Sequence, residues 1–323
     1  MHQDKKTPSR IRIGISTCLL GEKVRYDGGH KRDAFLTEVF GQYVEWVPVC
    51  PEVEMGLGIP REPVRLVQQE DGVHFVAIQS GTDHTEKMRR YATERLTALA
   101  GVGLRGYVLK RASPSCGMER VRIYQPSGMP ERDGSGMFAE ALMKRFPHLP
   151  VEEEGRLSDP RLRENFVSRV FAYHRWCEMA TQGVTRSALT RFHERHKFQL
   201  MAHNQAGAKR LGDILGKPGQ YADDGEMAAA YLDGFTNAMR RIPTPRNHTN
   251  VLQHMVGYFS KRLDPADRAE MTETVEKYRL GLVPLIVPIT LIRHYVRKFN
   301  VPYLQDQAYL NPHPHELMLL NQL

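Results

Sequence analysis

The hydrophobic pattern of this chain changes near residue 160, and this change constrains the fold more than any other feature. In the first half, short apolar runs with the length of a strand alternate with segments of helical periodicity. In the second half, long segments of helical periodicity follow one another with few strand-like runs between them. Alternating strands and helices are typical of a mostly parallel sheet covered by helices. We therefore expect an α/β domain with a mostly parallel sheet over residues 1–157 and an all-α domain over residues 158–323.

Strands of the first domain are predicted where apolar runs are bounded by turn residues. They fall at residues 11–16, 44–50 and 106–110, with a further pair around an Asp-Gly turn within residues 64–78. Helices are predicted at residues 33–43, 82–101 and 136–146. The second domain has a helix start signal at Ser158 or Asp159, because Pro160 suits the first helical position.

The composition is that of an ordinary soluble protein, with 41% hydrophobic and 25% charged residues in 323. The polar start of the chain lacks the apolar core of a secretion signal. The most apolar stretch, residues 280–292, is too short to span a membrane and contains two prolines. We therefore expect a cytoplasmic protein, in which the four cysteines are ligands, catalysts or core residues rather than disulfides.

Basic residues are concentrated in the second half. Between residues 161 and 217 there are eleven Lys and Arg residues and four acidic ones, and the net charge of the whole chain is +8. This bias permits a phosphate-binding surface and equally a set of solvated helix faces. Under the first interpretation, the residues assigned to RNA binding are Arg191, Arg195, Lys197, Lys209 and Arg210.

Three of the four cysteines lie at equivalent places, at the carboxyl ends of predicted strands. Cys18 comes two residues after the first strand, Cys50 ends the second, and Cys116 follows a later strand after a short turn. Because the carboxyl ends of parallel strands line one crevice, we expect the three thiols to meet in space. They could bind zinc with a water molecule, or a [4Fe-4S] cluster with one iron left without a protein ligand. The alternative is three unrelated buried cysteines, and spacing alone does not choose between zinc and iron.

Polar groups beside the cysteines are candidates for the chemistry. Glu52 lies two residues after Cys50 and could activate water or relay a proton, or else cap the following turn. Ser113 and Ser115 precede Cys116 and could hold a substrate by hydrogen bonds, or only shape the turn. These two serines and Glu52 are the candidate catalytic residues.

Five further residues are candidates for substrate binding. They lie in the segment after the first cysteine and in the turn before the third. The first segment would suit an anionic or heteroaromatic ligand, although it could equally be a surface turn. The candidates are Arg25, Tyr26, Asp27, Lys110 and Arg111, of which the last two would meet a phosphate.

Two other features are expected to be structural. Cys177 lies on the apolar stripe of a helical segment with Phe166 and Val170, so we expect it to pack in a core. The motif "HERH" at residues 193–196 is one residue short of the zinc-protease spacing, and we interpret it as a helix surface that faces solvent or RNA.

Three cysteine motifs occur in the order in which a known family has them. They read "STCLLGEKVRYDGG", "VPVCPEVEMGLGIPR" and "SPSCG", and together they resemble the TudS-type thiouracil desulfidase domain over about residues 10–155. The second half, with "HKFQLMAHN" and "NVLQHMVGYFSKRL", resembles the YbgA-type domain. The fusion is similar to the RudS-type desulfidases, which remove sulfur from 4-thiouridine in tRNA.

The resemblance implies a cofactor, a partner and a role for each site residue. Cys18, Cys50 and Cys116 would hold a [4Fe-4S] cluster whose fourth iron binds the thiocarbonyl sulfur of the substrate. Water would replace the sulfur at the pyrimidine carbon, and hydrosulfide would leave with no net redox change. Glu52 would handle the proton, and Ser113 or Ser115 would hold the substrate. The implied partner is tRNA that contains 4-thiouridine.

Two other functions stay open at this point. One is a desulfidase of free thiouracil or thiouridine monophosphate, in which the helical half serves for oligomerisation. The other is a non-catalytic metal-binding stress protein. Release of sulfide from a thiolated substrate would separate an enzyme from the last of these.

Overall fold

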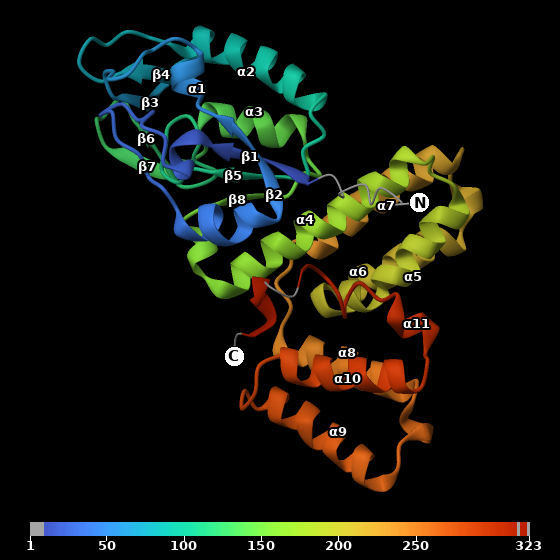
Figure 1. Ribbon diagram of the computed structural model, residues 1–323. Coiled ribbons are helices and arrows are strands. Elements are labelled where there is room, and N and C mark those ends of the chain that lie inside the picture. Colours follow the sequence, from blue (N-terminus) through green and yellow to red (C-terminus); the bar gives the residue numbers. More distant parts are fainter. Residues whose placement is uncertain (1–9, 315–316, 322–323) are drawn as a thin grey trace, which may run out of the picture. The chain divides into compact units, whose positions relative to one another are not determined.

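The computed structural model describes residues 10–314 and 317–321 of the chain (Figure 1). It divides into two compact units, residues 1–158 and residues 159–323. The first is an α/β unit and the described part of the second is mostly helical, which confirms the expected fold class. None of the helices in the described part is long and apolar enough to cross a membrane.

The main sheet of the first unit is fully parallel, with the strand order β2-β1-β5-β8. Its strands are β1 (Ile11–Ser16), β2 (Val44–Val49), β5 (Gly106–Leu109) and β8 (Val151–Glu153). The central strands are almost continuously apolar and buried, as expected for a sheet covered on both faces. Gly14 of β1 lies beside Tyr107 of β5, and a Cβ atom at Gly14 would lie 2.1 Å from the Tyr107 ring. The glycine therefore makes room for this buried ring.

Two helices of the first unit pack against each other, α2 (Thr85–Ala100) and α3 (Met137–Arg145). Phe138 of α3 contacts Tyr107 of β5, with ring centroids 6.3 Å apart. The helix expected at residues 33–43 is instead a π-helical turn, Phe35–Val39, followed by a 3-10 turn, Phe40–Gln42. The apolar spacing was therefore a correct sign of helical structure but not of a regular α-helix.

A second, mixed sheet has the order β4-β3-β6-β7. Its strands are β3 (Val64–Gln69), β4 (Gly72–Ala77), β6 (Val121–Tyr124) and β7 (Pro130–Gly134). The predicted hairpin around the Asp-Gly turn is present as β3 and β4, which pair antiparallel. Strands β6, β7 and β8 were not predicted. The sequence of β7, "PERDG", has no apolar residue, and β8 has only three residues, so neither shows a strand pattern.

The second unit is a succession of helices. They are α4 (Pro160–Thr181), α5 (Arg186–His203), α6 (Gln205–Gly216), α7 (Asp224–Met239), α8 (Pro245–Gly257), α9 (Pro265–Arg279), α10 (Ile286–Lys298) and α11 (Pro302–Gln305). The N-cap of α4 is Asp159, whose carboxylate accepts hydrogen bonds from the backbone N–H groups of Arg161 and Leu162. Helices α8 and α9 begin in the same way, with a Thr or Asp cap followed by Pro.

Described residues of this unit form one hydrophobic core from α4 to α7 and another mainly from α8 to α11. Cys177 packs against the first core, as expected. The interpretation of "HERH" as an exposed surface was wrong for His196, which is fully buried and stacks on Phe192 with ring centroids 4.0 Å apart. His193 is partly buried and lies 3.0 Å from the hydroxyl of Tyr231. The motif consists of polar residues and so suggested an exposed surface, although His196 lies on the face of α5 that packs in the core.

Candidate active site

Three neighbouring parallel strands bring the three cysteines to one end of the main sheet. Cys18 lies in a 3-10 turn (Thr17–Leu20) directly after β1, and Cys50 follows β2 at the start of α1 (Pro51–Glu54). Cys116 lies in the turn after β5. Because the strand order is β2-β1-β5, the three residues occupy adjacent positions, and all three line one pocket of about 380 Å³.

The turn that carries Cys116 is fixed by the start of α3. The backbone N–H groups of Met137 and Phe138 donate to the carbonyl oxygens of Pro114 and Ser115, each over 3.0 Å. A Cβ atom at Gly136 would lie 2.5 Å from the carbonyl carbon of Ser115, so only glycine lets the helix approach this closely. The free N–H groups of the helix are thus satisfied by the turn itself.

Burial makes the thiolate form of each cysteine unfavourable. It raises the pKa of Cys18 to about 11, with a further contribution from the neighbouring Cys50. Burial likewise raises the pKa of Cys50, and it raises that of Cys116 well above the usual range for a thiol. Thiolates in such a place need a bound cation to hold them deprotonated.

The donor set of the pocket fits a soft metal centre. Three thiols and no imidazole line it, and sulfur ligands favour iron–sulfur clusters or zinc over hard cations. Among residues 10–314 and 317–321, no three His, Cys, Asp or Glu side chains are arranged as they stand to hold a metal ion. The fit therefore rests on the kind of donor and on the shared pocket.

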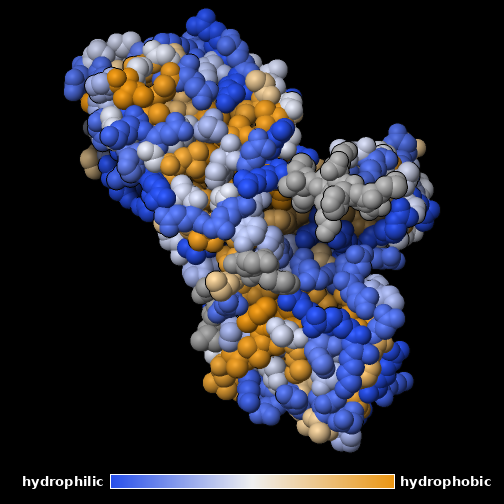
Figure 2. All heavy atoms as spheres, viewed as in Figure 1, coloured by the Kyte–Doolittle hydropathy of each residue, from blue (hydrophilic) through white to orange (hydrophobic). Residues whose placement is uncertain are grey.

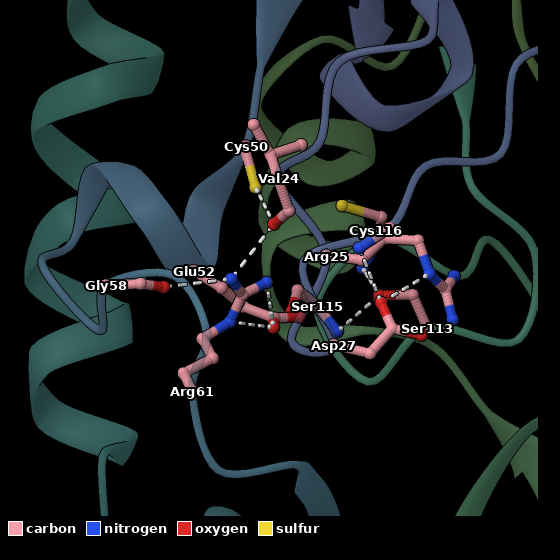
Figure 3. Close-up of polar contacts among 11 residues, drawn as sticks. Val24, Arg25, Asp27, Cys50, Glu52, Gly58, Arg61, Ser113, Ser115 and Cys116 are labelled. Carbon is pink, nitrogen blue, oxygen red and sulfur yellow. Dashed lines mark hydrogen bonds and ion pairs between the residues drawn. The ribbon is translucent and has the colours of Figure 1, made fainter.

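The Glu52 carboxylate is held by partners on both sides (Figure 3). One oxygen accepts from the Nε and Nη2 atoms of Arg61, over 2.9 and 2.8 Å, and the other accepts from the hydroxyl of Ser115. The side chains of Arg61 and Glu52 are 5% and 13% exposed, so the ion pair is largely buried. Glu52 does not cap the turn, because Glu54 accepts the backbone N–H of Cys50 over 2.9 Å.

Arg61 is the site residue that sequence reasoning missed. Its Nη1 atom donates to the carbonyl oxygens of Val24, over 2.9 Å, and Gly58, over 3.1 Å. The Val24 carbonyl also lies 3.8 Å from the sulfur of Cys50 (Figure 3). Arg61 thus joins the loop after Cys18 to the segment after Cys50. It was visible only as the last letter of "GIPR", where no periodicity distinguishes it.

The two candidate serines lie in different surroundings. Ser113 lines the pocket, and its Oγ atom accepts from the N–H groups of Ser115 and Cys116, over 3.2 and 3.1 Å. Its hydroxyl proton has no acceptor among the described residues and can be donated to a ligand. Ser115 is fully buried and donates its proton to Glu52. Ser113 can therefore reach a substrate, whereas Ser115 positions the carboxylate.

Of the candidate substrate-binding residues, some line the pocket and others are held by neighbouring groups or exposed. Arg25 and Tyr26 line the pocket, whereas Asp27 lies beside Arg25 at 3.5 Å and accepts the N–H of Gly29 over 3.0 Å. Lys110 also lines the pocket, but its Nζ atom forms a half-buried ion pair with Glu154 over 2.5 Å. Arg111 is exposed at the rim.

The five candidate RNA-binding residues of the second unit are all exposed on α5 and α6. Two of them have neighbours: Arg191 donates to the Oγ atom of Ser187 over 2.6 Å, and Arg195 lies 3.5 Å from Asp306. The structure leaves their charges available to solvent.

Comparison with known proteins identifies the family of the first unit. The family model for 2-thiouracil desulfurase matches residues 13–154. The uncharacterized protein YbbK of Bacillus subtilis (strain 168) is 31% identical over 146 residues, which are 44% of this chain and 95% of that protein. The chain belongs to the 2-thiouracil desulfurase family. It is therefore an enzyme of the desulfidase class, which cleaves carbon–sulfur bonds.

The second unit has relatives of its own. A family model described as a protein of unknown function, DUF1722, matches residues 197–314. The uncharacterized protein YbgA of Escherichia coli (strain K12) is 30% identical over 159 residues, which are 49% of this chain and 94% of that protein. The expected fusion of a desulfidase domain with a YbgA-type domain is thus confirmed.

One solved structure is also similar in sequence to the first unit. It is the [4Fe-4S]-dependent thiouracil desulfidase TudS, which is 34% identical to the chain. The match covers 46% of this chain and 95% of that one, with a TM-score of 0.38.

Proposed function

We propose that this protein is an iron–sulfur-dependent desulfidase that removes sulfur from 4-thiouridine in tRNA. The observation that carries the proposal is the single pocket that is lined both by three thiols from adjacent strand ends and by a carboxylate held by Arg61 and Ser115. The reaction balances without an oxidant or reductant: water adds its oxygen to the pyrimidine carbon, and the sulfur leaves as hydrosulfide.

The cofactor of this proposal is a [4Fe-4S] cluster, which Cys18, Cys50 and Cys116 would hold. When bound, it supplies a soft Lewis acid at the iron that has no protein ligand, where a thiocarbonyl sulfur can bind. The cysteines would hold this group at the carboxyl end of the parallel sheet, where α/β folds bind their ligands.

The polar residues of the pocket orient the substrate and move the proton. The Oε atoms of Glu52 accept a proton from the attacking water, while Arg61 and Ser115 hold the carboxylate in place. The hydroxyl of Ser113 donates to a polar atom of the pyrimidine, and Arg25 and Tyr26 form the pocket wall. The partly buried position of Glu52 limits competing water.

The choice of tRNA as substrate is supported by the basic second unit. The exposed Lys and Arg side chains of α5 and α6 suit phosphate groups, and cytoplasmic tRNA is an abundant polyanion. A base inside folded RNA must be unstacked before it can enter a recessed pocket, at a cost of a few kcal/mol. Contacts between the backbone and a basic surface would offset that cost.

The cofactor assignment can be tested on anaerobically purified protein. We expect a brown protein with about four irons per chain. Replacing Cys18, Cys50 or Cys116 with Ala should remove both the colour and sulfide release. Cys177→Ala is the matched control, because Cys177 packs against the helical core. This variant should keep both the colour and sulfide release. One zinc per chain and no iron after anaerobic purification would contradict the assignment.

The substrate assignment needs a comparison of polymer and monomer. Incubated with bulk tRNA, the enzyme should abolish the near-ultraviolet absorbance of 4-thiouridine and release an equal amount of sulfide. Reaction with free thiouracil or thiouridine monophosphate alone would instead favour a desulfidase of small molecules. If neither tRNA, thiouracil nor thiouridine monophosphate yields sulfide, the protein binds a metal but lacks this activity.

A further inference from the structure

A groove lined by arginines lies next to the cysteine pocket in the first unit. Its volume is about 720 Å³, and it shares Val64, Arg111, Ala112 and Pro114 with the cysteine pocket. Six arginines and two glutamates line it; they are Arg65, Arg111, Arg120, Arg122, Arg132, Arg156, Glu119 and Glu153. The groove is therefore strongly basic.

Three of these arginines form a row across neighbouring strands of the second sheet. Arg122 of β6 lies directly opposite Arg132 of β7. Leu66 of β3 pairs with Ile123 of β6 in a parallel register, so Arg65 lies beside Arg122 on the third strand. Like charges at directly opposed positions destabilise a sheet. Such a row is explained more readily by an anionic ligand than by the stability of the fold.

Most of these guanidinium groups have no carboxylate partner among the described residues. In the part of the chain that the structure describes, no carboxylate forms an ion pair with Arg111, Arg120, Arg122 or Arg132. Arg65 stacks over the ring of Tyr124 at 4.9 Å, and its buried Nε atom has no hydrogen-bond partner among the described residues.

The remaining charged residues of the groove are occupied. Arg156 is bound to Glu119 over 2.8 Å and to Glu152 over 2.6 Å. The buried Glu153 accepts the backbone N–H of Met118 over 2.7 Å. The positive charge that is left without a carboxylate partner among the described residues therefore belongs to the strand row and to Arg111 and Arg120, of which Arg111 also lines the cysteine pocket.

We propose that this groove binds the RNA backbone next to the nucleotide whose base enters the cysteine pocket. The proposal rests on the proposed function and adds a second RNA-binding site to it, within the catalytic unit. Arginine forks bind phosphate oxygens in pairs, and regularly spaced arginines suit successive phosphodiesters of a single strand. A site that shares a wall with the cysteine pocket would hold the flanking backbone while the base is unstacked.

The test uses Arg122→Gln and Arg132→Gln in the full chain, with Arg90→Gln as the control. Arg90 is exposed on α2 and lines neither pocket. Binding of an unmodified single-stranded RNA of about ten nucleotides is measured by fluorescence anisotropy at several salt concentrations. Each groove variant should weaken binding on the order of tenfold. It should also lower the slope of log Kd against log salt by about 0.7. Arg90→Gln should change neither quantity.

A second readout separates polymer from monomer. The ratio of kcat/KM for a thiouridine-containing oligonucleotide to that for free thiouracil should fall on the order of tenfold in each groove variant. The melting temperature should not fall, because each substitution relieves the opposition of Arg122 and Arg132.

The outcomes distinguish the groove from the reaction. If the groove variants bind RNA as tightly as Arg90→Gln does, the proposal that the groove binds RNA is wrong. The proposal is also wrong if the variants lower kcat/KM only for thiouridine monophosphate, since the groove would then hold a single terminal phosphate. Weaker RNA binding in a protein that releases no sulfide from thiolated RNA would support the groove and contradict the proposed function.

Discussion

At the scale of single residues, the Glu52 carboxylate is the group whose removal tests the chemistry most directly. Glu52→Gln keeps the shape of the side chain but removes its capacity to accept a proton. We expect kcat for sulfide release to fall about 10²- to 10⁴-fold, as is usual for a lost general base. Iron content should stay at the wild-type level, because the Glu52 carboxylate is hydrogen-bonded to Arg61 and Ser115 and forms no hydrogen bond with a cysteine of the described residues. Sulfide and iron assays on the same preparation measure both quantities.

The buried ion pair supplies the control for this variant. Glu52→Gln leaves Arg61 buried without its partner, at a cost on the order of 3–5 kcal/mol of stability. The double variant Glu52→Gln/Arg61→Met removes both charges and should recover most of that stability in a denaturant titration. It should not recover activity. Recovery of sulfide release in the double variant would show that the proton is handled elsewhere.

At the scale of elements, the strand ends were predictable because the strands before them are apolar. Strands β1 and β5 are nearly all buried, so each is visible as an apolar run, and each run places a cysteine at the same edge of the sheet. The position of Glu52 followed from its spacing to Cys50. Arg61 and the polar strand β7 were not predictable, because long-range ion pairs and backbone pairing determine them and leave no local pattern.

Buried histidines of the helical unit make its stability depend on pH. Burial lowers the pKa of His196 to about 3, of His203 to about 4 and of His248 to about 3. In the unfolded chain the ordinary pKa is about 6.5, so below that pH the unfolded state binds more protons. The stabilising contribution is thus present above pH 6.5 and is lost as pH falls toward 4 for His203 and toward 3 for His196 and His248. Each histidine contributes up to about 1.4 kcal/mol per pH unit.

Two histidines on α8 allow a matched test of this dependence. His248 is buried and lies 2.8 Å from the hydroxyl of Tyr309, whereas His254 is exposed. In His248→Gln, the loss of unfolding free energy between pH 7.5 and pH 5 should shrink by about 2 kcal/mol. His254→Gln should retain the wild-type dependence. Equal pH profiles for the two variants, measured by denaturant titration, would contradict the assignment of a neutral buried His248.

At the scale of the whole molecule, the proposed function requires the basic second unit to contribute to RNA affinity. Lys209 and Arg210 are exposed on α6, and Lys87 and Arg90 are exposed on α2, so each pair offers the same reversal of charge. Lys209→Glu/Arg210→Glu should weaken tRNA binding and lower the salt slope by roughly 1.5 to 2. Lys87→Glu/Arg90→Glu should have a much smaller effect at 0.15 M salt, since charges beyond about 8 Å from the RNA are screened.

The salt dependence of tRNA binding by the wild-type protein is the reference for both double variants. With about six phosphate contacts, affinity for tRNA should fall roughly a thousandfold between 50 and 200 mM salt. The net charge of +8 alone would favour any polyanion, so a length-matched single-stranded DNA without thiolated bases serves as the competitor. If the two double variants respond identically to salt, attraction is spread over the surface and α6 has no specific role. A loss of affinity confined to the α6 variant would assign the helical unit to tRNA binding. Both double variants change the net charge by the same amount, so a difference between them can come only from where the charges lie.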